Sequence, residues 1–194
     1  TWLFFEYFVY LTGKATIAVR EVYPDLSVGP LQVVLDTPHH LSYPVILEHQ
    51  GNVYMMPCTS RNGVDVYRAT DFPHHWVLDR VMLPDLPIAD ATPLRYQGRW
   101  WLFGSVSYPP TPNWDEVFVF YSDSPFGPWQ PHAKNPVKAH ALGARPAGNF
   151  FEYQGRLYRP GQNCQGGYGQ SVVFFEVITL TPEAYYEIPI EKPP

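Results

Sequence analysis

Hydrophobic positions along this chain fall into short runs separated by turn residues, without long amphipathic stretches. Runs such as residues 117–121 (VFVFY) and 171–177 (SVVFFEV) are rich in branched and aromatic side chains, which favour β-strands. The 22 prolines and 14 glycines interrupt the sequence too often for long helices. The pattern therefore predicts an all-β fold and excludes a helical bundle.

One segment occurs in three similar copies, at residues 43–58, 90–105 and 145–162. Each copy contains a Gln-Gly pair with an aromatic residue three positions after the glycine. A glycine turn between two strand-like runs is typical of a β-hairpin. We therefore expect Gly51, Gly98 and Gly155 to lie in equivalent hairpin turns.

Each hairpin is followed by a second strand-like pair, and four strands in about 50 residues is the period of a β-propeller blade. Residues 2–6 (WLFFE) match residues 101–105 (WLFGS), so the first blade is expected to lack its innermost strand. An antiparallel sandwich also fits short strands. Because residue identities recur at fixed offsets from the turn, we favour one propeller domain over residues 1–194, with three full blades and part of a fourth. The second pairs are expected at residues 64–69 and 77–83, at 117–121 and near Trp129, and at 171–177 and 185–190.

An incomplete blade leaves a strand edge that invites pairing with another strand. The tail, residues 184–190, could cover this edge, or a second copy of the chain could supply the missing strands. Because three and a half blades fall short of a closed ring, we favour a homo-oligomer.

Charge and composition exclude several classes of function. The net charge of −5, without a cluster of Lys or Arg, excludes nucleic acid and anionic membranes as expected partners. No apolar run approaches the ~20 residues of a membrane span, and the first residues lack the basic region of a secretory signal. Two cysteines leave the redox compartment undecided. We expect a soluble protein and favour the cytoplasm.

Polar residues recur at matching positions around the three turns, where the inner strands of a propeller would bring them together at its axis. Tyr43 and Asp90 precede their turn glycines by eight residues. Gln162 follows its glycine by seven, and Glu6 takes the same place in the partial copy. His40 lies just upstream of Tyr43, and Arg145 lies two residues before the matching position of the third copy, on the same strand face. These are our candidate site residues.

Each candidate also has a structural explanation. Asp90 could form an Asx-turn, Arg145 could clamp a carboxylate between blades, and Glu6 could simply reach solvent. The adjacent histidines at 39–40 and 74–75 point to opposite faces of a strand and make no chelate. We therefore predict neither a metal site nor a cofactor.

Several short motifs together carry a resemblance to a known family. They are residues 40–44 (HLSYP), 54–57 (YMMP), 72–76 (FPHHW), 98–103 (GRWWLF), 123–129 (DSPFGPW), 145–148 (RPAG) and 157–159 (LYR). In combination they resemble the N-terminal propeller domain of plant glucosamine inositolphosphorylceramide transferases.

The resemblance implies a five-bladed propeller of the arabinanase, levansucrase and invertase group, with an active site in the axial funnel. It also implies that Asp90, Thr92 and Arg145 belong to the site. Cys58 and Asn163 stand where the family usually has carboxylates.

Three functions fit these residues, and we rank glycan binding first. A glycan or glycolipid head group would bind through hydroxyl contacts to His40, Tyr43, Thr92, Arg145, Gln162 and Asn163. An active glycoside hydrolase or transferase would use Asp90 and Glu6 as its pair of carboxylates. A propeller that binds only other proteins is the third hypothesis.

Overall fold

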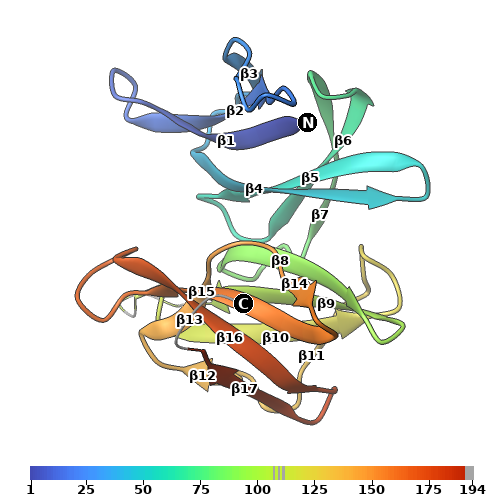
Figure 1. Cartoon of the computed structure of the whole chain (residues 1–194), viewed down its shortest axis with the longest axis vertical. Helices are drawn as coiled ribbons and strands as arrows, with labels where there is room; N and C mark the ends of the chain where they lie inside the picture. The colour runs from blue at the N-terminus through green and yellow to red at the C-terminus, as the bar shows by residue number, and fades with distance from the viewer. Residues whose placement is uncertain (107, 109, 111, 191–194) are drawn as a thin grey trace. The chain divides into compact units, whose positions relative to one another are not determined.

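The structure is a computed structural model that describes residues 1–106, 108, 110 and 112–190 (Figure 1). Every regular element among these residues is a β-strand, and none is a helix that could cross a membrane. The chain divides into two compact units, Thr1–Asp85 and Leu86–Pro194.

The first unit contains two antiparallel sheets in which sequential strands are neighbours. The three-stranded sheet has the order β1-β2-β3, and β1 pairs only with β2 among the described residues. The four-stranded sheet has the order β4-β5-β6-β7. The hydrophobic core of the first unit includes Ile17, Leu41 and Met55. The strands are β1 (Trp2–Val9), β2 (Lys14–Glu21), β3 (Gln32–Leu35), β4 (Leu41–His49), β5 (Asn52–Thr59), β6 (Val64–Asp71) and β7 (His75–Met82).

The second unit repeats this architecture with two larger sheets. Their orders are β11-β10-β9-β8, with β12 also on β10, and β13-β15-β16-β17, with β14 also on β15. Buried side chains of β9, β10, β13, β15 and β16 form one cluster, which includes Phe103, Val119 and Ala144. The strands are β8 (Ile88–Tyr96), β9 (Arg99–Val106), β10 (Glu116–Ser122), β11 (Gln130–Pro131), β12 (Lys138–Ala139), β13 (Leu142–Pro146), β14 (Phe151–Tyr153), β15 (Arg156–Asn163), β16 (Ser171–Leu180) and β17 (Tyr185–Pro189).

The three turn glycines occupy equivalent hairpins, as predicted. Gly51, Gly98 and Gly155 have φ values of 75°, 78° and 75°, and the glutamine before each also has a positive φ, between 48° and 50°. Two successive residues with positive φ are the signature of a type I′ turn, whose twist matches that of the flanking strands. A Cβ on any of these glycines would meet nothing within 4 Å, so the backbone conformation and not crowding favours glycine there.

The strands predicted after each hairpin are also present, including β17 at the C-terminal tail. That tail pairs with β16 and forms the outer strand of its own sheet. The alternative in which residues 184–190 cover an open edge elsewhere is therefore wrong. Association with a second copy of the chain stays a prediction.

A buried charge network anchors β17. Arg159, with 1% of its surface exposed, donates from Nε and Nη2 to the two carboxylate oxygens of Glu187 at 2.7 and 2.6 Å. Nη2 also donates to the carbonyl of Gly143 at 2.6 Å, and Lys138 Nζ donates to Glu187 at 2.8 Å. Burial alone would raise the pKa of the Glu187 carboxyl, but the charges and hydrogen bonds of Arg159 and Lys138 outweigh it and hold that pKa below its ordinary value.

Glu187→Gln should lower the free energy of unfolding by about 3–5 kcal/mol at neutral pH, because Arg159 would stay buried without its counter-charge. The pKa of Glu187 is lowered on folding, so its contribution is complete above its ordinary pKa near 4.5 and is lost as the pH falls toward the folded value. Urea unfolding between neutral pH and pH 3 measures both effects. Glu176→Gln is the matched control, since Glu176 pairs with the exposed Arg156; an equal loss in both variants would contradict the anchoring role.

Candidate functional site

The innermost strands of the sheets carry irregularities at matching places. The pairing register shifts between Ser42 and Val45 in β4 and between Ala89 and Thr92 in β8. Inside these bulges Tyr43 and Asp90 have φ values of 48° and 53°, the left-handed region that non-glycine residues seldom adopt. A bulge redirects side chains out of the usual alternation, and such strain gathers at functional sites.

Asp90, Arg145 and Gln162 meet at the bulge of β8, as the alignment of the copies predicted. Arg145 Nε donates to Asp90 Oδ2 at 2.6 Å, and Gln162 Nε2 donates to the same oxygen at 3.3 Å. Only 3% of Asp90 and 7% of Arg145 is exposed, so the ion pair is largely withdrawn from water. The second carboxylate oxygen, Oδ1, accepts no hydrogen bond from the described residues.

Two loops complete this group with an amide and aromatic rings. Arg145 Nη1 donates to the side-chain oxygen of Asn113 at 2.8 Å. The Tyr168 ring lies 5.0 Å from the guanidinium carbon of Arg145 and packs against Trp114, with 5.9 Å between ring centroids. Tyr168 is 61% exposed, so much of it is available for contact. We call Asp90, Asn113, Arg145, Gln162 and Tyr168 the Arg145 cluster.

Two of the predicted residues shape the backbone around the Arg145 cluster. Thr92 is fully buried, and its hydroxyl donates to the carbonyl of Asp90 at 2.9 Å, which holds the bulge. The side-chain oxygen of Asn163 accepts the backbone N–H of Gln165 at 3.1 Å, which helps to form the loop that carries Tyr168. The structure thus gives both residues a conformational role.

The remaining candidates belong to the first unit. His40 Nε2 lies 3.5 Å from Glu6 Oε1, and His40 Nδ1 accepts the backbone N–H of Ala15 at 3.3 Å. Because Nδ1 accepts, the neutral ring carries its proton on Nε2, toward Glu6. Both side chains are partly exposed, at 38% for His40 and 41% for Glu6. The two carboxylates of the catalytic hypothesis, Glu6 and Asp90, therefore lie in different units.

Other groups considered from the sequence have simpler surroundings. His75 pairs with Asp71 at 3.2 Å, and the His74 ring packs against Trp2. Cys58 and Cys164 are not joined by a disulfide. Within the part of the chain that the structure describes, no three His, Cys, Asp or Glu side chains gather as metal ligands do.

Sequence reasoning missed Asn113, Trp114 and Tyr168, which lie in loops outside the repeated segments. The one local signal was the run at residues 166–169 (GGYG), where glycines flank an aromatic residue. Such a run is typical of a loop that presents its aromatic side chain outward.

Comparison with known sequences gives a consistent result. Residues 1–193 match the model of the family described as the N-terminal region of glucosamine inositolphosphorylceramide transferase 1. The proteins of that name from Oryza sativa subsp. japonica and Arabidopsis thaliana are 39% and 35% identical to this chain, each over 97% of it. The chain spans 26% and 25% of their lengths.

Comparison with solved structures concerns the fold. The exo-β-1,3-galactanase of Phanerochaete chrysosporium, solved with galactose, superposes with a TM-score of 0.68 over 90% of this chain and 42% of its own, at 13% identity. The Cellvibrio cellulosa α-L-arabinanase complexed with arabinohexaose superposes with a TM-score of 0.67. The match covers 96% of this chain and 73% of the arabinanase, at 15% identity. Together with the four antiparallel sheets that the described residues form, these likenesses confirm an incomplete propeller fold.

Arg145→Met and Asp90→Asn should each lower the free energy of unfolding by about 3–5 kcal/mol, because each change leaves a buried partner without its counterpart. The double variant should lose clearly less free energy of unfolding than the two single variants lose together, since neither charge is then buried without its partner. Urea unfolding of all four proteins measures this coupling. Arg95→Met, at an exposed arginine of β8, is the control and should change stability little. Strict additivity would show that the pair contributes no coupling.

Proposed function

Because the chain belongs to the family of glucosamine inositolphosphorylceramide transferase 1 N-terminal domains, we propose that it is a glycan-binding propeller module. Its ligand is a carbohydrate or the sugar head group of a glycoconjugate, and it binds at the Arg145 cluster. The relatives are named as transferases, and the structural neighbours were solved with galactose and arabinohexaose. These names point to sugar chemistry as the common theme. The five-bladed ring implied by the resemblance is part of this proposal, since the described residues form four sheets.

The buried pair of Asp90 and Arg145 is the observation that carries the proposal. Apolar side chains of similar volume would stabilise such a position as well or better, because burying charges costs desolvation energy. Asp90 also sits in a strained backbone conformation. The desolvation cost and the backbone strain both fall on Asp90, which favours a functional explanation for this residue over a purely structural one.

The chemistry of the Arg145 cluster suits sugar hydroxyls. Each hydroxyl both donates and accepts, and the cluster combines an arginine, two amides and a carboxylate, which are groups that hydrogen-bond with hydroxyls. The charges of Asp90 and Arg145 compensate each other, so a neutral polyol meets no excess charge. The exposed ring of Tyr168 adds a flat apolar surface of the kind on which sugar rings pack.

Binding is favoured over hydrolysis because Asp90 is the single carboxylate of the Arg145 cluster. Glycoside hydrolysis needs two carboxyls, about 5 Å apart for retention or about 6.5–9.5 Å apart for inversion. Oδ2 of Asp90 already accepts hydrogen bonds from Arg145 and Gln162, which makes it a poor proton acceptor for a reaction. Asp90 therefore acts in this proposal by positioning Arg145 and by accepting a ligand hydroxyl at Oδ1.

A catalytic function is the second candidate, favoured by the arrangement of Glu6 and His40. The ring proton of His40 faces the Glu6 carboxylate, an arrangement that also orients histidines in acid–base catalysis. Turnover of β-1,3-galactotriose or arabinohexaose that disappears in Glu6→Gln would establish catalysis in place of simple binding.

Tyr168→Ala should weaken glycan binding about tenfold, which corresponds to about 1.4 kcal/mol, because the sugar ring loses its aromatic surface. Isothermal titration with β-1,3-galactotriose, arabinohexaose, glucosamine and inositol phosphate measures the change. Tyr168 lies outside the buried ion pair, so the variant should keep its fold.

Tyr153→Ala is the matched control, since Tyr153 is an exposed tyrosine of β14 in the same unit, with 46% of its surface accessible. Equal losses in the two tyrosine variants would remove the Arg145 cluster from the proposal. If no glycan on a broad array binds the unaltered protein, the protein-interaction hypothesis takes precedence.

A further inference from the structure

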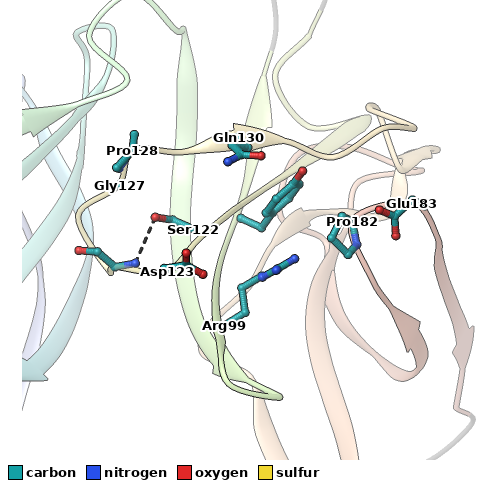
Figure 2. Close-up of a pocket in the computed structure, with 10 residues that line it drawn as sticks. Arg99, Ser122, Asp123, Gly127, Pro128, Gln130, Pro182 and Glu183 are labelled. Atoms are coloured by element: carbon teal, nitrogen blue, oxygen red, sulfur yellow. Dashed lines mark hydrogen bonds between the residues drawn. The ribbon is translucent and has the colours of Figure 1, made fainter.

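A polar cavity lies in the second unit, at the end of β9 that is remote from the Arg145 cluster (Figure 2). Its volume is about 440 Å³, within the range of about 300–1,000 Å³ typical of small-molecule sites. An adjoining cavity of about 230 Å³ shares Arg99, Asp123 and Pro182 with it. We call the two adjoining cavities together the Arg99 groove.

Three strands and two turns build the Arg99 groove. Tyr121 of β10 pairs with Trp101 of β9 and with Gln130 of β11, so these side chains share one face of the sheet. Arg99 stands two residues before Trp101 on that face, and its guanidinium carbon lies 5.1 Å from the centre of the Tyr121 ring. The Tyr121 ring therefore holds the arginine fork in place before any ligand arrives.

The turns around the groove are held by hydroxyl groups, which leaves their carboxylates unused. Ser122 and Ser124 side-chain oxygens accept the backbone N–H groups of Ser124 and Phe126 at 3.1 and 3.2 Å. In the turn between β16 and β17, the Thr181 hydroxyl accepts the N–H of Ala184 at 3.0 Å. Among the described residues, the carboxylates of Asp123 and Glu183 make no ion pair or hydrogen bond, and both line the cavity.

Figure 2 shows how these groups surround one space. The side chains of Arg99, Asp123 and Gln130 reach it from separate segments, with Glu183 on one side and Pro128 on the other. Arg99 also makes no ion pair within the described part of the chain. Donors and acceptors thus face the groove without partners of their own.

We propose that the Arg99 groove is a second carbohydrate-binding site, which takes a neutral saccharide unit of an oligosaccharide or glycoconjugate. One arginine and two carboxylates give the groove a net charge of −1, which disfavours phosphate or carboxylate ligands. An arginine fork, an amide and two carboxylates match hydroxyls that both donate and accept. The proline and tyrosine side chains supply the apolar contact that sugar rings need.

This site is separate from the Arg145 cluster and does not depend on it. Arg99 begins β9, whereas Ser105, which pairs with Ala89 beside Asp90, lies near its end. At about 3.3 Å per residue, Arg99 and Ser105 are about 20 Å apart along β9. A saccharide in the groove therefore contacts none of the residues of the Arg145 cluster, and an oligosaccharide could bind at either site alone.

Chemical-shift titration of the ¹⁵N-labelled full chain tests the proposal. The probes are β-1,3-galactotriose, arabinohexaose and cellotriose at millimolar concentration. The Tyr168→Ala variant distinguishes binding at the Arg99 groove from binding at the Arg145 cluster. In that variant, amides of residues 121–130 and 181–184 should still shift. Arg99→Ala should weaken this response at least about tenfold, because a charge-assisted hydrogen bond is lost.

Arg95→Ala is the matched control, since Arg95 is an exposed arginine in the same hairpin that does not line the groove. If Arg99→Ala fails to fold, Gln130→Ala tests the groove at an exposed residue of the edge strand. Absence of shifts with all three saccharides would overturn the proposal. Shifts caused instead by a Lys- and Arg-rich peptide, and abolished by Asp123→Asn with Glu183→Gln, would make the groove a peptide site.

Discussion

The ion pair between Arg145 and Asp90 joins the two sheets of the second unit, and the candidate site depends on it. Asp90 reaches Arg145 because a bulge turns its side chain out of the alternation of β8, and Thr92 holds that bulge. Arg145 in turn contacts Asn113 and Tyr168, which come from two separate loops. The strained strand, the neighbouring sheet and both loops therefore meet at one guanidinium group.

A second buried arginine shows what a structural role looks like in the same unit. Arg159 is enclosed by Glu187 and the Gly143 carbonyl, all within regular strands, and the ring near its guanidinium group is that of Phe175 in β16. Arg145 instead lies beneath an exposed ring. The clamp on a carboxylate that was the structural alternative for Arg145 is present, and in addition an exposed tyrosine ring packs on this arginine. The surroundings, and not burial itself, distinguish the two arginines.

The blades combine a constant framework with variable ends. The Gln-Gly turns repeat with nearly the same dihedral angles, whereas the residues at the bulges differ, with Tyr43 in one sheet and Asp90 in another. The loop that carries Tyr168 belongs to the Arg145 cluster, whereas the turns at residues 123–129 and 181–184 line the Arg99 groove. Because separate connections form the two sites, each can change its residues without disturbing the other.

The hairpins, the order of the strands and the incomplete first sheet could be predicted from the sequence, because each follows from local signals. Gly51, Gly98 and Gly155 encode their own turns, and the repeat placed Asp90 and Gln162 at matching strand positions near Arg145. Only the tertiary structure decided which side chains meet across longer stretches of chain. Glu187 lies 28 residues from Arg159, and Tyr168 lies in a loop outside the repeat, yet each contacts a buried arginine. Such contacts depend on how separate sheets and loops pack, and no local pattern records that packing.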